Sequence, residues 1–409
     1  MRHNGQMSSF ADDRSPGDQS PHRMPHDVQS AASENPVPTS PVGLSGTQDT
    51  PPTKKLRWRP YAGVVGLLGM CFTLLIGLLI PVPYVIEKPG PAFNTLGAPQ
   101  GTKIIDVKGH QTYTTSGALS MTTVSVEGAP GNTVHATDVL KAWLNSDEAV
   151  APREAFFPPG QSQSQVQLVN TVQMTTSQDL AVAAALSALK IPYQRSVIVA
   201  GVGHDAAALG VLEPGDRIIA LRGETEADAQ GYRTLAGSSP AGQKIPVVVR
   251  RNGRDLKLEV PTKVVDGRSL MGVVLSDGYQ FPFDVSINLQ DVGGPSAGMM
   301  FALGVYDTLT PGSLTGGQNI AGTGTIDAQG QVGSIGGIRQ KMIGAHSGGA
   351  RFFLAPAANC SQVVGHIPEN LQVVRVNTLD DAIRAVTAIG KTGNAQGLPT
   401  CTGTSEAAH

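Results

Sequence analysis

Two short glycine-rich stretches, GGPSAG at Gly293–Gly298 and GGIRQK at Gly336–Lys341, determine how the C-terminal part of this chain is interpreted. The first contains Ser296 and the second contains Lys341, in settings that suit a Ser–Lys catalytic pair. A lysine acts as a base near neutral pH when it is shielded from water, because burial disfavours its charged form. The residues around Lys341 therefore decide whether such a pair is plausible.

Ser296 is expected at a junction between a strand and a helix. The preceding stretch FDVSINLQ, residues 283–290, alternates apolar and polar residues as a strand does. The following stretch SAGMMFALGVYDTL, residues 296–309, is apolar with helical continuity. Glycines permit close backbone approach, and Pro295 suits the first turn of a helix. The free N–H groups at such a helix start can bind the oxyanion that forms when a peptide carbonyl is attacked.

Two other interpretations of Ser296 stay open on this stretch alone. The residue can be a helix N-cap in a glycine-rich turn, with no chemical role. GGPSAG is also formally G-x-S-x-G, the nucleophile elbow of α/β-hydrolases, which needs an acid and a histidine further along the chain. Asp327 with His346 or His366 are the candidates, although the chain after Ser296 is short for the rest of such a sheet.

Lys341 lies in IRQKMIGAHS, residues 338–347, which follows two glycines and is predicted to be a helix. The apolar stripe of this helix consists of Ile338, Met342 and Ala345. Lys341 falls on the same stripe, whereas Arg339 and Gln340 are expected to point away. A lysine on a buried face can lose its charge and take a proton from Ser296. The alternative is a surface lysine whose amine reaches water.

The composition excludes several classes of function. The chain has 409 residues and a net charge of −2, with no basic footprint for nucleic acid. No G-x-x-x-x-G-K-[ST] phosphate loop occurs, so no ATPase of that class is expected. The three cysteines form no C-x-x-C pair, and we expect no metal site and no cofactor. Cys360 and Cys401 could form a disulfide if this part lies outside the cytoplasm, or could be two free thiols.

The N-terminal region predicts a membrane anchor. Residues 1–58 hold too few apolar side chains to offset chain entropy and are expected to be a disordered cytoplasmic tail. Residues 61–80, YAGVVGLLGMCFTLLIGLLI, carry no charge and match a bilayer in length, so we expect a transmembrane helix. A cleaved signal peptide is the alternative, but no small-x-small cleavage site follows. The preceding basic residues place the N-terminus in the cytoplasm and residues 84–409 outside; they are Lys54, Lys55, Arg57 and Arg59.

The segment from 84 to 190 is mixed in character. A strand is expected at 117–126 and a short helix at 137–144, with Thr137 or Asp138 near its start. A strong helix is expected at 177–189, with Ser177 as its N-cap and a role in packing.

A compact β-rich unit is predicted over residues 195–262. It contains the strand SVIVAGV, a short helix in HDAAALG and a hairpin around Asn252-Gly253. This order resembles bacterial PDZ domains, whose signature A-x-x-A-G-L-x-x-G-D-x-I aligns with Ala207–Ile218, where Leu209-Gly210-Val211 stands in place of A-G-L. The resemblance implies that an extended peptide end binds by β-augmentation. A plain β-domain spacer is the alternative.

Several motifs, in order and at matching spacing, closely resemble the proteolytic domain of Lon (endopeptidase La). They are GPSAG at 294–298, TG at Thr323-Gly324, GGIRQK at 336–341 and GAHSGG at 344–349. The resemblance covers about residues 268–388, with 389–409 as a C-terminal tail. It implies that Ser296 is the nucleophile, Lys341 the general base and Thr323 a residue that hydrogen-bonds the lysine. One departure is Gly293, where Lon often has an acidic residue.

The whole layout is similar to that of bacterial membrane-anchored Lon-like proteases with a PDZ domain. It implies an α/β (α+β) fold with one N-terminal transmembrane helix, a β-rich PDZ domain and a Lon-type proteolytic domain with a mixed sheet, whose first part comes from residues 84–190. The implied function is an ATP-independent Ser–Lys endopeptidase on the outer face of the cytoplasmic membrane, acting on unfolded or flexible proteins and peptides. Relatives of Lon often form rings, so a homo-oligomer is compatible with the resemblance. A non-catalytic PDZ adaptor on a retained protease scaffold is the alternative.

Overall fold

The candidate membrane anchor is a single helix. The computed structural model describes residues 59–240, 242–289 and 292–402, so the predicted tail 1–58 and the last residues of the predicted tail 389–409 lie outside the described residues. Helix α1, Arg59–Leu78, coincides closely with the predicted span, and its Tyr61–Leu78 segment is long and apolar enough to cross a membrane. The chain divides into two units after Ala62, and every element from β1 onward belongs to the second unit.

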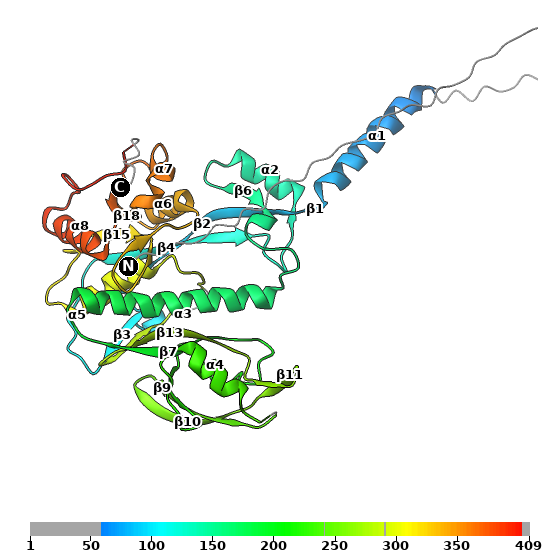
Figure 1. Ribbon diagram of the computed structural model, residues 1–409. Helices are drawn as coiled ribbons and strands as arrows, with labels where there is room; N and C mark the ends of the chain where they lie inside the picture. Colours follow the sequence, from blue (N-terminus) through cyan, green and yellow to red (C-terminus); the bar gives the residue numbers. More distant parts are fainter. Residues whose placement is uncertain (1–58, 241, 290–291, 403–409) are drawn as a thin grey trace, which may run out of the picture. The chain divides into compact units, whose positions relative to one another are not determined.

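A mixed sheet of six strands forms the centre of the second unit, in the order β19-β18-β15-β4-β2-β6 (Figure 1). The strands from β4 to β19 run parallel to one another, whereas β2 pairs antiparallel with both β4 and β6. Strands from both ends of the second unit therefore share one sheet. Their bounds are β2 Tyr84–Asn94, β4 Ala118–Glu127, β6 Ala149–Pro152, β15 Asn319–Gly322, β18 Phe352–Pro356 and β19 Gln372–Val376.

Helices cover both faces of this sheet, because its central strands are apolar on both sides. Ile320 and Phe352 belong to a core shared with α3, α5 and α8, whereas their neighbours Ala321 and Phe353 belong to a second core shared with α6 and α7. Successive residues of a strand point to opposite faces, so such strands need a helical layer on each side. The helices are α3 Gln163–Ala188, α5 Gly298–Leu309, α6 Ile338–Ser347, α7 Cys360–Val363 and α8 Leu379–Thr392.

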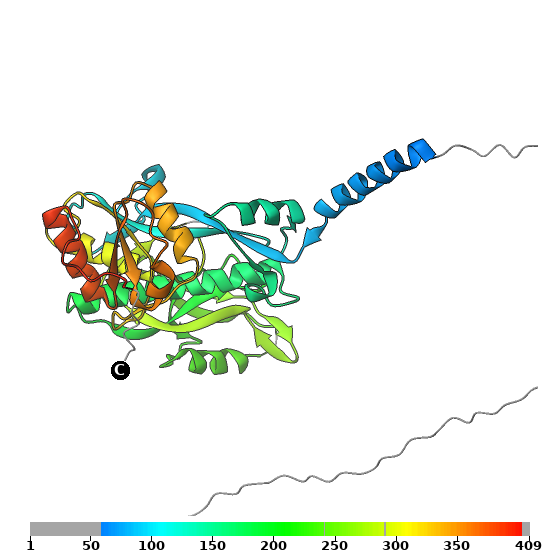
Figure 2. The same ribbon diagram turned by 90° about the horizontal axis from the view of Figure 1, so that it is seen from above.

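Shorter elements lie around the start of the sheet. Helix α2, Ala136–Leu144, packs on β5, β6 and β2 (Figure 2). The Asp138 carboxylate accepts a hydrogen bond from the N–H of His135, the N-cap residue, so the helix predicted at 137–144 is confirmed. The other short strands are β1 Pro81–Val82, β3 Ile105–Lys108, β5 Val134–His135, β14 Asp284–Ile287, β16 Thr325–Ile326 and β17 Val332–Gly333, and the 3-10 turns are Pro99–Gly101, Arg153–Ala155 and Ala357–Asn359.

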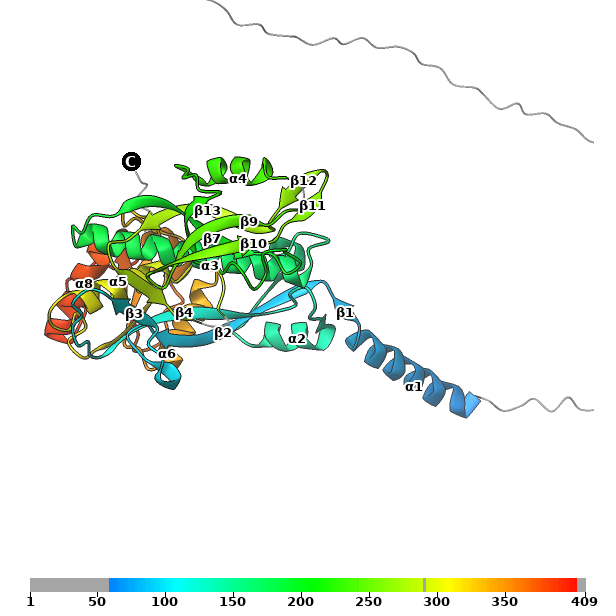
Figure 3. The ribbon, with the colours of Figure 1, turned by 90° about the horizontal axis from the view of Figure 1, so that it is seen from below.

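Residues 194–280 form a second antiparallel sheet, here called the β-rich unit, in the order β10-β9-β8-β7-β13 (Figure 3). The hairpin predicted around Asn252-Gly253 is confirmed, because both residues have the positive φ that a tight hairpin turn requires. Strand β13 extends this sheet beyond residue 262. The bounds are β7 Gln194–Val202, β8 Arg217–Leu221, α4 Ala229–Gly237, β9 Ile245–Arg251, β10 Arg254–Val260, β11 Lys263–Val265, β12 Arg268–Leu270 and β13 Val273–Gln280.

The expected α/β fold class is confirmed, whereas three local predictions are wrong. Ser177 is not an N-cap, because α3 begins much earlier, where Ser162 and Gln165 form a capping box. The HDAAALG segment forms turns rather than a helix, and Gly210 within it has a φ of +77°. Gln340 is buried and does not point away, since α6 packs against both the sheet and α7.

Candidate active site

Ser296 lies in the segment that joins β14 to α5. Gly298, the first residue of α5, approaches its surroundings so closely that a Cβ atom would lie 2.9 Å from both Ile326 Cγ2 and Ser177 Oγ. Gly294 has a φ of +86°, which glycine adopts without strain. The glycines of GGPSAG therefore allow the Ser296 segment to pack directly against α3 and β16.

Ser296, Lys341 and Thr323 come from three separate segments and meet at one point. Lys341 Nζ lies 2.7 Å from Ser296 Oγ and 3.2 Å from Thr323 Oγ1. Thr323 Oγ1 donates in turn to the carbonyl oxygen of Ser296 at 3.0 Å, and the N–H of Gly324 donates to the same oxygen at 2.8 Å. Thr323 thus holds both the amine of Lys341 and the backbone of Ser296. The structure brings together all three residues that the sequence singles out; their catalytic roles stay a prediction.

Lys341 is only 3% exposed, although it ends in an amine. Helix α6 begins after Gly337, whose φ of +66° turns the chain, and packs onto β2 and β4. The packing is tight, since a Cβ atom on Gly344 would lie 2.5 Å from the carbonyl oxygen of Gly90. Burial lowers the pKa of Lys341 from 10.5 to about 8. A substantial fraction of the amine is therefore neutral close to physiological pH.

A cleft of about 570 Å³ opens beside Ser296 and Lys341. Its walls come from β2, β4, α3 and the glycine-rich segments around Gly294 and Gly336. Among the described residues, none accepts a hydrogen bond from the N–H of Ser296 or Ala297. Both N–H groups are therefore not engaged by another described residue, and their expected role in stabilising an oxyanion stays a prediction.

Glu87 on β2 lines the same cleft, and the sequence reasoning missed it. Burial raises the pKa of its half-buried carboxyl group, and the positive charge of Lys341 opposes that shift. The Glu87 carboxylate in turn raises the pKa of Lys341, against the larger effect of burial. Glu87 lies far upstream of every motif discussed above, in YVIEKPG, so no local pattern pointed to it.

Helix α3 connects this site to the β-rich unit. Ser177 Oγ donates a hydrogen bond of 3.0 Å to the carbonyl oxygen of Pro295, directly before Ser296. Two residues later on α3, Asp179 accepts from Arg217 Nη1 at 2.7 Å and from the N–H of Tyr279 at 2.9 Å. One helix thus contacts the segment of the candidate nucleophile and two strands of the β-rich unit.

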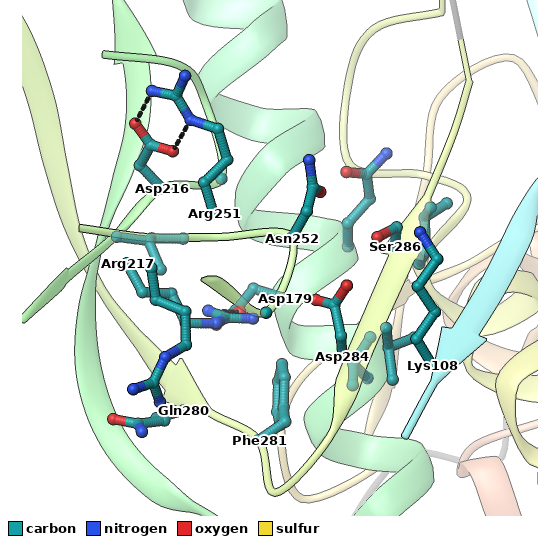
Figure 4. A pocket seen from close by; sticks show the side chains of 18 of the residues that line it. Lys108, Asp179, Asp216, Arg217, Arg251, Asn252, Gln280, Phe281, Asp284 and Ser286 are labelled. Carbon is teal, nitrogen blue, oxygen red and sulfur yellow. Dashed lines mark hydrogen bonds and ion pairs between the residues drawn. The ribbon is translucent and has the colours of Figure 1, made fainter. Parts of the chain in front are cut away.

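A second cavity, about 920 Å³ in volume, lies where α3 and β14 face the β9–β10 hairpin (Figure 4). The carboxylate of Asp179 and the guanidinium of Arg217 lie at this cavity, and Arg217 also lies 4.6 Å from the ring centre of Phe281. Burial raises the pKa of Asp179, and the charge of Arg217 opposes that shift. Arg251 is bonded through two nitrogens to Asp216. These ion pairs hold charged groups that would otherwise be buried alone.

The α/β-hydrolase alternative gains no support from the geometry. No hydrogen bond between described residues joins His346 or His366 to Ser296, and His346 is exposed. The carboxylate of Asp327 instead accepts from backbone N–H groups of its own turn. Over the described ranges, no group of three His, Cys, Asp or Glu residues is placed to hold a metal.

Cys360 and Cys401 form a disulfide, with their Cα atoms 5.0 Å apart. The bond joins the segment after α8 to α7, and the N–H of Arg375 donates to the carbonyl oxygen of Pro399 in the same segment at 2.8 Å. The packed fold therefore continues past residue 388, into the predicted C-terminal tail. Cys71 is a free and exposed thiol.

Comparison with known proteins identifies one part of this chain. Residues 290–388 match the model of the Lon protease (S16) C-terminal proteolytic domain. A Lon protease of Clostridioides difficile is 37% identical over 94 residues, which are 22% of this chain and 12% of that protein. A Lon protease of Campylobacter concisus is 30% identical over 137 residues, which are 31% of this chain and 17% of that protein. The resemblance to the Lon proteolytic domain is thus confirmed for residues 290–388, and the chain spans only a small part of these relatives.

One solved structure gives a much weaker comparison. The crystal structure of a PDZ domain from an SdrC-like protein of Listeria innocua shows 19% identity and a TM-score of 0.18, over 20% of this chain and 92% of that chain. Such a score carries no argument for the fold.

Proposed function

We propose that this chain, whose residues 290–388 form a Lon-type (S16) proteolytic domain, is a membrane-anchored, ATP-independent serine endopeptidase. The observation that carries the proposal is the 2.7 Å contact between Ser296 Oγ and the buried amine of Lys341. A lysine with a pKa of about 8 is a competent base near neutral pH. The contact of Thr323 with both partners favours an active site over a scaffold without catalysis.

The geometry supports acyl transfer in two steps. In the first step, neutral Lys341 takes the hydroxyl proton of Ser296 while Oγ attacks the peptide carbonyl carbon. The N–H groups of Ser296 and Ala297 stabilise the oxyanion, and the lysine ammonium gives its proton to the departing amine. In the second step, Lys341 takes a proton from water as the water attacks the acyl ester. It then returns a proton to Ser296 Oγ, and the new carboxylic acid leaves.

Unfolded or flexible segments are the proposed substrates. The sequence has no phosphate loop with which to drive unfolding. Strand β4 pairs with β15 only as far as Met121, and its following residues, Thr122–Val126, line the cleft. Among the described strands, none pairs with β4 on that side of this stretch. An extended peptide could add to this free edge and reach Ser296, whereas a folded protein could not.

The proposed location is the outer face of the cytoplasmic membrane, with the N-terminus inside. Helix α1 supports the anchor by its length and composition, and the basic residues before it support the orientation. The Cys360–Cys401 disulfide supports an oxidising compartment. Protease added to intact spheroplasts should digest the domain after α1; complete protection would contradict this orientation.

The β-rich unit is proposed to act as a PDZ domain that presents substrate or gates the site. The support is its contact with α3, in which Asp179 pairs with Arg217 while Ser177 holds Pro295. A change in the β-rich unit that displaced α3 would therefore also disturb the segment that carries Ser296.

The endopeptidase proposal is tested with the purified full chain and a panel of flexible peptides. Ser296→Ala and Lys341→Ala should reduce cleavage to background, because one removes the nucleophile and the other removes its base. Lys391→Ala, an exposed lysine on α8, is the matched control and should cleave normally. Cleavage by both active-site variants at the rate of the unmodified chain would contradict the proposal.

If only the unmodified chain cleaves, comparative proteomics of cells that carry the unmodified or the Ser296→Ala protein would identify the substrates.

A further inference from the structure

Helix α2 carries an apolar stripe that no described residue covers. Leu140, Trp143 and Leu144 are 49%, 69% and 82% exposed, and their spacing of three and four residues places them on one face of the helix. The face of Val139 and Ala142 is instead buried against the sheet. We call the three exposed residues the α2 stripe. An exposed tryptophan flanked by two exposed leucines is costly in water and indicates a contact surface.

The α2 stripe is tied to the end of the candidate membrane span. Strand β1, Pro81–Val82, follows α1 closely and pairs with β5, Val134–His135. The next residue, Ala136, is the first of α2, and its N–H donates to the carbonyl oxygen of Ile80 at 3.3 Å. The chain therefore enters α2 from a strand paired with the first residues after the anchor (Figures 2 and 3).

Aromatic side chains gather around the same exit point. The N–H of Arg153 donates to the carbonyl oxygen of Pro83 at 3.0 Å, which fixes the loop that bears Phe156 next to the chain leaving α1. Tyr84 and Phe156 are 36% and 39% exposed. Tyrosine and tryptophan concentrate at membrane–water boundaries, because their rings are apolar with one polar end.

We propose that the α2 stripe lies in the boundary between headgroups and acyl chains of the bilayer that α1 spans. The inference rests on the proposed membrane anchoring. A second copy of the chain or another protein could also cover such a face. The chain that leaves α1, however, forms β1, and β1 pairs with the strand that leads into α2, so the bilayer is the surface that the fold holds next to the stripe. The tether keeps α2 near the surface, so even weak burial suffices for docking. The charged residues around the stripe, Lys141, Asp147 and Glu148, carry no net positive charge, so docking depends on apolar burial more than on attraction to anionic lipid.

The test uses the fluorescence of Trp143 in the full chain. The sequence contains two tryptophans, Trp58 and Trp143, so Trp58→Phe leaves Trp143 as the sole reporter. The variant is reconstituted in vesicles of phosphatidylcholine and phosphatidylglycerol, with or without a phosphatidylcholine brominated on its acyl chains. We expect brominated lipid to quench most of the Trp143 emission, because the bromine atoms lie among the acyl chains. Acrylamide, which is dissolved in the water, should quench the same emission only weakly.

Two further variants make the result specific. Trp58→Phe/Trp143→Phe/Leu209→Trp moves the reporter to Leu209, an exposed position of the β-rich unit. Its emission should respond to acrylamide and not to brominated lipid. Leu140→Ser/Leu144→Ser in the Trp58→Phe background keeps Trp143 but removes the rest of the α2 stripe, and should weaken quenching by brominated lipid.

The outcomes separate this inference from the anchor on which it rests. If the protein floats with the vesicles but Trp143 stays open to acrylamide and unaffected by bromine, the docking inference is wrong and the anchor stands. If Trp143 is shielded from acrylamide without any effect of bromine, protein covers the α2 stripe and the inference is also wrong. If the protein does not float with vesicles, the anchor and the docking fail together.

Discussion

The hydroxyl of Ser177, in the interior of α3, donates a 3.0 Å hydrogen bond to the carbonyl oxygen of Pro295, the residue directly before Ser296. Ser177 itself is buried, and α3 holds the backbone of the candidate nucleophile from one side. Thr323 and Gly324 hold the carbonyl of Ser296 itself. The position of Ser296 is therefore set by two segments that lie outside GGPSAG, α3 and Thr323-Gly324.

Ser177→Ala should lower kcat/KM by about five- to tenfold, because one hydrogen bond contributes about 1 kcal/mol and here it positions Ser296. The peptide-cleavage assay measures the change. Ser187→Ala is the control, since Ser187 lies on the same helix but bonds Tyr193 and Ala328. Equal losses in both variants would show that the effect is a general weakening of α3.

Activity should rise with pH and level off above about pH 8. The neutral amine of Lys341 is the proposed base, and burial lowers its pKa to about 8, so protonation below that value removes the base. A pH profile of kcat/KM on a neutral peptide measures this. A rise centred near pH 6 to 7 would instead indicate a histidine base and contradict the role of Lys341.

Gly344→Ala should destabilise the protein and reduce activity. The new Cβ atom would meet the carbonyl oxygen of Gly90 at 2.5 Å, so α6 must move away from β2, and it carries Lys341 with it. Overpacking of this kind costs about 1–3 kcal/mol. Gly237→Ala on α4 is the control, because no atom lies within 4 Å of its Cβ position. Thermal unfolding measures the melting temperature of both variants, and only Gly344→Ala should melt at a lower temperature. An unchanged melting temperature of Gly344→Ala would contradict the tight packing of α6 on β2.

Asp179→Asn should loosen the β-rich unit from α3. It leaves the guanidinium of Arg217 without its charged partner, and breaking a buried pair costs about 3 kcal/mol or more. Asp255→Asn breaks the more exposed pair with Arg250 and should cost less than about 1 kcal/mol. Thermal unfolding and limited proteolysis compare the two variants. Similar shifts would mean that the Asp179 pair is not a structural link.

Removal of the Cys360–Cys401 disulfide should destabilise the C-terminal part of the domain. The bond closes a loop with a sequence separation of 41, which corresponds to about 4 kcal/mol in the chain-entropy description. Cys360→Ser/Cys401→Ser should therefore melt at a lower temperature, as should the unmodified protein in reductant. Cys71→Ser, which removes the free thiol, should leave the melting temperature unchanged. A melting temperature insensitive to reductant would contradict the bond.

The sequence identified Ser296 and Lys341 because each stands in a local pattern. The glycines around Ser296 predict a tight turn, and the stripe of α6 predicts a buried Lys341. The start of α3 also has a local signal, the capping pair of Ser162 and Gln165, although Ser177 offers a competing N-cap within the same stretch. Glu87 had no such signal, because its position at the cleft depends on how β2 pairs with β4.

The sequence by itself determined the apolar span, the hairpin at Asn252-Gly253, the helix of Lys341 and the proteolytic-domain motifs. Each depends on neighbours along the chain, through periodicity, turn chemistry or motif spacing. Only the tertiary structure decided that Ser177 supports Pro295, that Asp179 pairs with Arg217 and that the α2 stripe stands beside the end of the span. These contacts join segments far apart in sequence, and they form only when the sheet brings the segments together.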